Sequence, residues 1–259
     1  MVFVCMVEKI RKAIYSGSFY PAEEKKLSSM IDGFLSQANP KKILGKLRAL
    51  TVPHAGYIYS GLTAAFAYKA LGIAKPKRIV LFGPSHHDYL NGAYGFDEKW
   101  ETPLGIVPAA KSRLEVIKND REHSLEVQLP FLQKVLADFE FVPVIYGEAD
   151  AKEIAQIAEE LSSKDSVIIA SSDLSHYLPY EEAKQADNST IGSILALDLE
   201  KFLKIGDACG KIGIAALIIL ARKNKWRPIL LDYKNSGDTS GDKKGVVGYA
   251  AIAFVEEGR

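Results

Sequence analysis

The hydrophobic residues of this chain fall into two kinds of pattern that follow one another along the sequence. Short apolar runs of strand length alternate with longer segments whose apolar residues recur at helical spacing. The runs predict strands at residues 48–54, 77–83, 139–147, 166–172, 227–233 and 246–254. The longer segments predict helices at residues 21–38, 60–72, 124–139 and 150–163, with two or three more between 180 and 224. This alternation predicts an α/β sandwich whose central sheet is mostly parallel or mixed and is flanked by helices.

Glycine and proline positions refine this outline. Residues 88–110 combine glycines and prolines with aromatic residues, which favours short hairpins over a helix. Pro130 is expected to kink the helix at 124–139 or to mark its start. Gly206 and Gly210 are expected to separate the later helices. No linker divides the chain, so we expect one domain at residues 1–259, with residues 1–10 as a loose N-terminal extension.

Charge and composition narrow the classes of function. The 33 basic and 32 acidic side chains nearly cancel, which gives no basic surplus for binding nucleic acid. The apolar stretch at 212–221 is too short to span a bilayer, and the charges at the N-terminus follow the apolar run, unlike those of a signal peptide. Cys5 and Cys209 form no CxxC pair, so we expect a cytoplasmic protein, with a single disulfide as the alternative.

Histidines, carboxylates and hydroxyls gather just beyond the predicted strands. In open α/β folds, the ligand crevice lies beyond the carboxyl ends of the strands. His123 precedes a helix and is able to face the same edge, so all five histidines of the chain can belong to one site. The residues that follow the strand ends are His54, Ser85, His86, His87, Asp173, His176, Asp238 and Thr239.

Each of these residues also has a plain structural interpretation. A single histidine at a strand end is usually a hydrogen-bonded structural residue, and Asp173 is placed to cap the next helix. His86 and His87 point to opposite sides of an extended chain, so one of them can line the crevice while the other packs. The combination favours a site, because five unrelated structural histidines are not expected beside turn motifs.

The residue types limit the chemistry of such a site. Two neutral imidazoles and a carboxylate suit iron(II), or zinc or copper in another geometry. A further histidine suits proton transfer, and an aspartate beside a histidine can fix its tautomer. Ser85 beside His86 is conceivable as a nucleophile, but no GxSxG motif surrounds it. Neither a P-loop nor a GxGxxG motif supports nucleotide binding.

Several motifs together resemble the Memo (mediator of cell motility) family. They run from about residue 11 to the last predicted strand, so the resemblance covers nearly the whole chain. It implies a fold similar to the class III extradiol ring-cleaving dioxygenases, with a comparable cleft. The motifs are SGSFYP (16–21), VPHAGYIYSG (52–61), GPSHH (83–87), EHSLEVQLPF (122–131), SSDLSHY (171–177) and VVGYAA (246–251).

The resemblance also implies roles for particular residues. His54 and His86 match the two histidines taken as metal ligands in the family. Asp173 and His176 match an Asp-x-x-His motif of the cleft, and His123 falls in the family's EHS motif; these three are the expected catalytic residues. Ser85, His87, Asp238 and Thr239 are expected to line the cleft.

The third metal ligand is an open question at this stage. Animal members of the family carry a cysteine at the position of Thr239, and threonine is a poor metal ligand. Asp238, Asp242 or water are the alternatives for the third ligand. Cys209 precedes a predicted helix in another segment, and we expect it to lie outside the site.

These implications favour a redox metal, iron(II) or copper with zinc as the alternative, and an oxidoreductase acting on a small organic molecule. The main alternative is a non-enzymatic adaptor that uses the cleft to recognise a peptide, an anion or a partner protein. A third hypothesis is a zinc-type hydrolase. The resemblance also suggests an AMMECR-type protein and a radical-SAM protein as partners.

Overall fold

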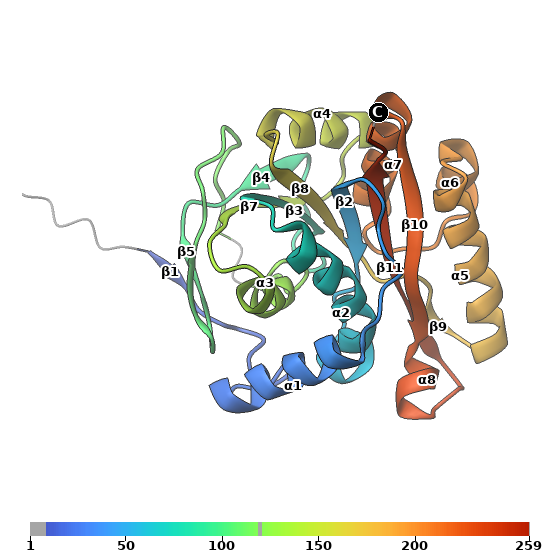
Figure 1. Cartoon of the computed structure of the whole chain (residues 1–259), viewed down its shortest axis with the longest axis horizontal. Coiled ribbons are helices and arrows are strands. Elements are labelled where there is room, and N and C mark those ends of the chain that lie inside the picture. The colour runs from blue at the N-terminus through green and yellow to red at the C-terminus, as the bar shows by residue number, and fades with distance from the viewer. Residues whose placement is uncertain (1–8, 119–120, 259) are drawn as a thin grey trace, which may run out of the picture.

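A mixed β-sheet runs through the centre of the computed structural model, which describes residues 9–118 and 121–258 (Figure 1). Its strand order is β10-β11-β2-β8-β3-β7-β4, and β9 pairs with one end of β11. Strands β2, β8, β3 and β7 are parallel, whereas β11 and β4 are antiparallel to their neighbours. The strands are β2 (Lys46–Val52), β3 (Arg78–Pro84), β4 (Ala93–Gly95), β7 (Glu140–Tyr146), β8 (Ser166–Ser171), β9 (His176–Leu178), β10 (Trp226–Asn235) and β11 (Val246–Glu256).

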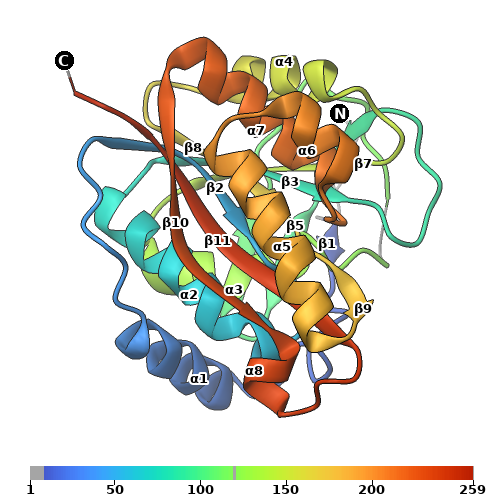
Figure 2. The same ribbon diagram turned by 90° about the vertical axis from the view of Figure 1, so that its right-hand side faces the viewer.

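Helices cover both faces of this sheet (Figure 2). One face carries α1 (Glu24–Gln37), α2 (Tyr57–Ala74), the 3-10 turn η1 (Glu126–Gln128) and α3 (Leu129–Val135). The other face carries α4 (Ala151–Leu161), α5 (Tyr180–Leu195), α6 (Leu199–Ile205) and α7 (Lys211–Asn224). A short helix, α8 (Ser236–Ser240), connects β10 to β11. The predicted α/β class and mixed sheet are thus confirmed.

Alternation along the strands produces two cores. Successive side chains of a strand point to opposite faces, so Leu50 and Ile169 pack toward α1–α3 while Ala49 and Ile168 pack toward α4–α7. All four side chains are nearly inaccessible to solvent. Strands that are buried on both faces need continuous apolar runs, which explains why the sequence shows such runs and no alternation with polar residues.

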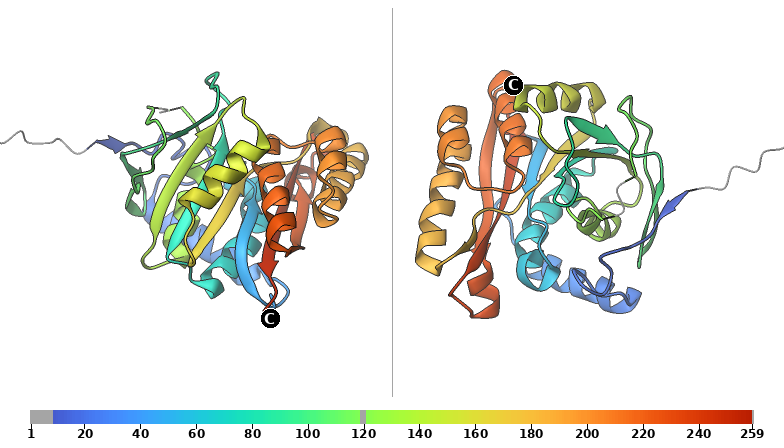
Figure 3. Two further views of the ribbon diagram at one scale, coloured as in Figure 1. Left: turned by 90° about the horizontal axis from the view of Figure 1, so that it is seen from above. Right: turned by 180° about the vertical axis from the view of Figure 1, so that it is seen from behind.

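A smaller sheet stands beside the main one, as both views of Figure 3 show. It contains β1 (Ile10–Arg11), β5 (Lys99–Thr102) and β6 (Gly105–Pro108), and β5 and β6 form an antiparallel hairpin. The predicted hairpins within residues 88–110 are therefore confirmed. Most of the predicted N-terminal extension, with Cys5, lies outside the described residues, but Ile10 pairs with Lys99 and is not loose.

Helices α3, α6 and α7 begin or end at the proline and glycines that the sequence analysis singled out. Pro130 lies in the first turn of α3, directly after η1, so it begins the helix. Gly206 ends α6, and Gly210 precedes the first residue of α7. Strand β9 and helix α8 were not predicted, because three and five residues are too short to show a period. Within the described part of the chain, no helix has the length and apolarity to cross a membrane.

Candidate metal and ligand site

The parallel strands bring their carboxyl ends to one edge of the sheet, and a cleft of about 640 Å³ lies there. Its walls are formed by the loops after β2, β3, β8 and β10, by the loop before η1, and by β9. Five of the predicted site residues line this cleft, namely His54, His86, His123, Asp173 and His176. The predicted convergence of these loops is therefore present in the structure.

His54 is held in one tautomer by the strand beside it. Its Nδ1 lies 2.9 Å from Oγ of Ser171 at the end of β8. That hydroxyl donates its one proton to the carbonyl oxygen of Ser124, at 2.6 Å, and also accepts a bond from Gln128. Because the hydroxyl proton is already used, Nδ1 of His54 must donate, and Nε2 keeps its lone pair. Burial, followed by the charge of His86, lowers the pKa of His54 to about 3, so the ring is neutral.

His86 is oriented by a buried carboxylate. Its Nδ1 lies 2.9 Å from Glu122, which also accepts backbone N–H bonds from His86 and Ser124 at 2.7 Å each. Burial raises the pKa of Glu122, but the hydrogen bonds and charge of His86 outweigh burial and lower it to about 2. An ionised carboxylate only accepts hydrogen bonds, so Nδ1 donates and Nε2 of His86 is left free. This carboxylate–histidine pairing is the arrangement that orients metal-binding histidines.

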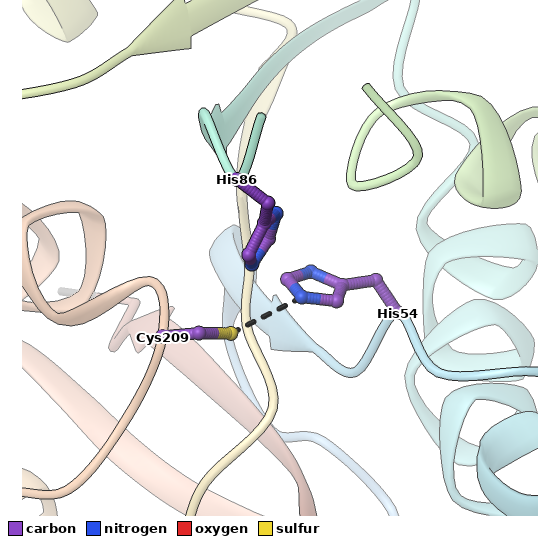
Figure 4. A group of neighbouring side chains, drawn as sticks. All are labelled: His54, His86 and Cys209. Carbon is purple, nitrogen blue, oxygen red and sulfur yellow. Dashed lines mark hydrogen bonds between the residues drawn. The ribbon is translucent and has the colours of Figure 1, made fainter. Parts of the chain in front are cut away.

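Cys209 lies beside these two rings, and Figure 4 shows its side chain pointing toward them. Its Sγ is 3.1 Å from Nε2 of His54. Our expectation that Cys209 lies outside the site is therefore wrong. The loop before α7 is tied to the end of β8, since the Gly210 N–H donates to Oγ of Ser172 at 2.9 Å. A Cβ on Gly210 would lie 2.6 Å from the Ser171 carbonyl oxygen, so glycine permits this close approach.

The thiol of Cys209 is buried in a setting that disfavours its charge. Burial, together with the nearby Asp173 carboxylate, raises the pKa of Cys209 to about 12. Without a cation, the group is therefore a neutral thiol. Thiolates are stabilised by a bound metal ion, which releases the thiol proton. The sulfur is thus protected from adventitious reaction until a cation is bound.

His54, His86 and Cys209 have the composition and spacing of a metal-binding set. Their potential ligand atoms all lie within 4.8 Å of one another. Metal bonds to nitrogen and sulfur of about 2.0–2.3 Å place two ligands of one ion roughly 3–4 Å apart. Imidazole and thiolate suit copper, iron or zinc and do not suit magnesium or calcium. The residues present therefore fit a transition metal.

A second group of donors is less well suited to a metal. His86, Glu122 and His123 also have ligand atoms within 4.8 Å of one another. The Glu122 oxygens, however, already accept the ring N–H and the backbone N–H of His86, together with the Ser124 N–H. A metal on Glu122 would have to displace these bonds. In the set that contains Cys209, a metal would replace only the bond between Sγ and Nε2 of His54 and would keep the Nδ1 bonds that orient the two rings.

The three predicted catalytic residues surround the donor set. The His123 ring centroid lies 5.2 Å from that of His54 and 4.6 Å from that of His86. Burial, followed by the charge of His54, lowers the pKa of His123 to about 3. Burial raises the pKa of Asp173 to about 6, although the His54 N–H donates to it at 2.8 Å. His176 is exposed at the mouth of the cleft on β9.

Ser85 and His87 were predicted to line the cleft, but neither is among its lining residues. The Ser85 hydroxyl donates to the carbonyl oxygen of Asp88 at 2.7 Å and closes the turn after β3. The ring of His87 turns to the exposed side, where Nε2 lies 3.1 Å from the Tyr15 hydroxyl. His86 and His87 lie in the bend that follows β3, where Glu122 holds the His86 ring toward the cleft and the Tyr15 hydroxyl contacts the His87 ring.

Asp238 and Thr239 also lie off the cleft lining. Asp238 accepts the backbone N–H of Asn235 at 2.9 Å and thereby caps α8. The Thr239 hydroxyl donates to the carbonyl oxygen of Ser236, and the side chain is exposed. Both predicted cleft residues are thus used in a helix that the sequence reading did not foresee. Asp242, from the turn after α8, does line the cleft.

Aromatic residues of the cleft were missed in the sequence reading. Phe19 precedes α1, Tyr59 lies in the first turn of α2, and Tyr177 and Tyr249 come from β9 and β11. They come from four separate segments, and of the four only Tyr177 is next to a predicted site residue, His176. The family motifs SGSFYP, VPHAGYIYSG, SSDLSHY and VVGYAA contain these four residues, and they gave the signal that these segments belong together.

The fold and site define an α/β protein with a histidine–cysteine cleft at the carboxyl edge of its sheet. Residues 11–253 match the family model described as Memo-like protein. The chain is 36% identical to MEMO1 family protein Ta0237 of Thermoplasma acidophilum over 95% of this chain and 98% of that one. It is 35% identical to a MEMO1 family protein of Aquifex aeolicus over 95% and 100% of the two chains. It is 37% identical to one of Methanosarcina acetivorans over 94% and 98%. The chain therefore belongs to the Memo family, as its motifs predicted.

Proposed function

We propose that this Memo-family protein binds iron(II) or copper through His54, His86 and Cys209 and is an oxidoreductase that acts on a small organic molecule in the cleft. The observation that carries the proposal is the convergence of two Nε2 atoms and one Sγ from three separate loops. Each imidazole has its Nδ1 engaged by a neighbouring group, so that Nε2 is directed to the common centre. A bound ion of this kind supplies one-electron redox chemistry.

The protein's own groups prepare the donor atoms. Ser171 and Glu122 hold the His54 and His86 rings in the tautomer that leaves Nε2 unprotonated. The His54 ring, which burial keeps neutral, therefore needs no proton loss before it binds a cation. The Cys209 thiol does need to lose its proton. Asp173 lies beside this thiol, and the backbone N–H of Asp173 donates to Sγ of Cys209 at 3.2 Å. Metal uptake should consequently release about one proton per site.

Asp173 is the group best placed to move a proton on the substrate. It lines the cleft and is 4% exposed, and burial raises its pKa to about 6. A carboxylate with this pKa is ionised at neutral pH and accepts and returns protons readily. The backbone N–H of His54 donates to one of its oxygens at 2.8 Å, and the backbone N–H of Ala55 also bonds to this carboxylate. His176, at the mouth of the cleft, is a second candidate for this role.

Zinc is the alternative metal, because two histidines, a cysteine and an open fourth position also make a catalytic zinc site. In that case the reaction would be hydrolysis by a metal-activated water. The adaptor role, the AMMECR-type and radical-SAM partners and the cytoplasmic location stay predictions.

An anaerobic metal titration of the metal-free chain tests the proposal. Iron(II), copper(I) and zinc(II) would each be titrated by calorimetry, and bound metal measured by elemental analysis. We expect one ion per chain in the wild type and loss of that ion in His54→Ala, His86→Ala and Cys209→Ala. His87→Ala is the matched control, because this neighbouring histidine lies off the cleft lining and should bind metal normally. Unchanged binding in His54→Ala or His86→Ala would contradict the proposal.

A further inference from the structure

The cleft lining contains acidic side chains that no lysine or arginine of its described residues balances. Its carboxylates are Asp173 and Asp242, and among the described lining residues there is neither lysine nor arginine. The nearby Lys243 ammonium lies over the Tyr180 ring, 4.4 Å from its centroid. An anion that enters the cleft therefore meets two carboxylates and neither lysine nor arginine among the described lining residues.

The remaining walls are largely aromatic. Phe19 packs against His123 at the inner end, with 4.9 Å between the ring centroids. Tyr59 and Tyr177 stand at the mouth and are 39% and 79% exposed. Exposed aromatic side chains beside a cleft offer flat faces on which a ligand ring can stack. Such faces also attract cations through the ring quadrupole.

The backbone at Tyr177 is held in an unusual conformation. Its φ is +59°, in the left-handed region that residues with side chains rarely adopt. The neighbours on both sides are paired with β11, His176 with Val247 and Leu178 with Val246, and the register is irregular between them. Irregularities of this kind redirect a side chain. Here the irregularity places the Tyr177 ring in the wall of the cleft.

From the acidic lining and the aromatic mouth together, we infer that the cleft takes a small aromatic molecule that is cationic or uncharged, and that it rejects anions. A volume of about 640 Å³ accommodates a single-ring ligand. Asp242 provides the charge preference near the entrance, and Tyr177 with Tyr59 provides the stacking surface. This inference rests on the proposed function and names the substrate class of the same site.

A matched ligand series tests the inference on the full-length, metal-free chain. The series is phenethylamine, 2-phenylethanol and 3-phenylpropionate, which share a ring and differ in charge, with 2-cyclohexylethylamine as a non-aromatic cation. Metal is left out because a carboxylate ligand is able to coordinate it directly. Dissociation constants would be measured by calorimetry or by ligand-observed NMR. We expect phenethylamine to bind most tightly, 2-phenylethanol less tightly, and 3-phenylpropionate and the cyclohexyl amine most weakly.

Two variants, each with a matched control, test whether Asp242 causes the charge preference and whether Tyr177 provides the stacking surface. Asp242→Asn should weaken phenethylamine about two- to fivefold, as expected for loss of an exposed ion pair, and leave 2-phenylethanol unchanged. Its control is Asp138→Asn, an aspartate that is 90% exposed and does not line the cleft. Tyr177→Ala should weaken both ligands about five- to tenfold. Its control is Tyr89→Ala, a tyrosine of similar exposure, 83%, away from the cleft lining.

The inference is overturned if 3-phenylpropionate binds as tightly as phenethylamine, if Tyr177→Ala changes no affinity, or if no aromatic member binds at millimolar concentration. None of these results bears on the metal titration, which uses His54, His86 and Cys209 and no organic ligand. A chain that binds metal but shows no charge preference would thus retain the proposed function and lose this inference. A chain that shows the ligand preference but binds no metal would lose the proposed function.

Discussion

Sγ of Cys209 lies 3.1 Å from Nε2 of His54, although 155 residues separate them in the chain. In the donor set proposed above, Cys209 takes the place that the sequence analysis gave to Asp238, Asp242 or water. The contact arises because the loop before α7 is fastened to the end of β8, next to the loop that carries His54 after β2. The proposed third donor therefore comes from the loop before α7 and not from α8.

Thr239→Cys should not tighten metal binding. The Thr239 side chain is exposed and bonded within α8, and it does not line the cleft. We expect its metal affinity to match that of the wild type within about threefold, whereas Cys209→Ser should lose at least tenfold because a hydroxyl is a poor ligand for a soft metal. Anaerobic competition with a chromophoric chelator measures both. If Thr239→Cys tightens binding and Cys209→Ser does not weaken it, the assignment of the third ligand is wrong.

Ser171→Ala should weaken metal binding by about 10- to 100-fold, the usual cost of losing a group that orients a ligand. The substitution removes the acceptor that keeps the proton on Nδ1 of His54. Nitrogen NMR of the His54 ring in the metal-free protein should then show the other tautomer becoming populated. Ser166→Ala, at the opposite end of β8, is the control and should affect neither measurement. An unchanged tautomer with unchanged affinity would refute the role assigned to Ser171.

Gly210→Ala should reduce both stability and metal affinity. An added Cβ would lie 2.6 Å from the Ser171 carbonyl oxygen and from Cβ of Ser172, so the loop that carries Cys209 must move. Gly192→Ala is the control, because that helical glycine in α5 has open space around it and alanine favours helix by about 1 kcal/mol. Thermal unfolding and metal titration of both variants make the comparison. Full metal affinity in Gly210→Ala would show that the close approach is not needed.

The site residues at the strand ends could be predicted from the sequence. The way in which the helices pack against the sheet, and with it the position of Cys209, could not. Apolar runs fix where strands stop, so the sequence predicted that His54, His86 and Asp173 meet at one edge. The position of Cys209 depends on how α7 packs against β8, which no local pattern encodes. Gly210 was predicted as a helix break, and its second role, a close backbone contact, appears only in three dimensions.

The same limit explains the cleft-lining residues that were misplaced. Asp238 and Thr239 were predicted in an open loop because polar residues and glycines dominate that segment. Asn235 and Asp238 instead form a capping box at the start of the five-residue helix α8. Their side chains therefore bond backbone N–H groups of this helix. A single turn of helix leaves no periodic signal. This turn nonetheless determines where the side chains of Asp238 and Thr239 point, which is away from the cleft lining.

Glu126→Gln should destabilise the fold by about 3–5 kcal/mol, the usual cost of removing one partner of a buried ion pair. Arg11 and Glu126 are 2.5 Å apart, and their side chains are 1% and 0% exposed. Glu126 also accepts bonds from the Tyr20 hydroxyl and the Tyr15 N–H at 2.7 Å each. Chemical denaturation gives the free energy of unfolding.

The matched control for that pair is Glu257→Gln. Arg227 and Glu257 lie 2.7 Å apart, but their side chains are 48% and 64% exposed. Exposed ion pairs contribute about 0–1 kcal/mol because water screens them. A loss in Glu126→Gln no larger than the loss in this control would show that the buried pair does not hold the N-terminal segment to η1.

The metal-free protein should lose stability as pH falls from about 6.5 to 3. Burial, as the first cause, lowers the pKa of His54 and of His123 from 6.5 to about 3 in the folded protein. Between those values the unfolded chain binds two protons that the folded chain does not. The free energy of unfolding therefore falls as the pH falls. Denaturation curves at several pH values, recorded with a chelator present, measure the slope.

Asp173 opposes this trend and provides the sharpest test of it. Burial raises its pKa from 3.8 to about 6, so between these values the folded chain binds one proton more than the unfolded chain. Asp173 thus adds stability as the pH falls from about 6 to 4, and Asp173→Asn removes that contribution. The variant should lose stability more steeply than the wild type in this window, and His123→Gln should lose it less steeply. Parallel slopes for all three proteins would mean that these groups titrate alike in the folded and unfolded states, and the burial of the site would then have no electrostatic consequence.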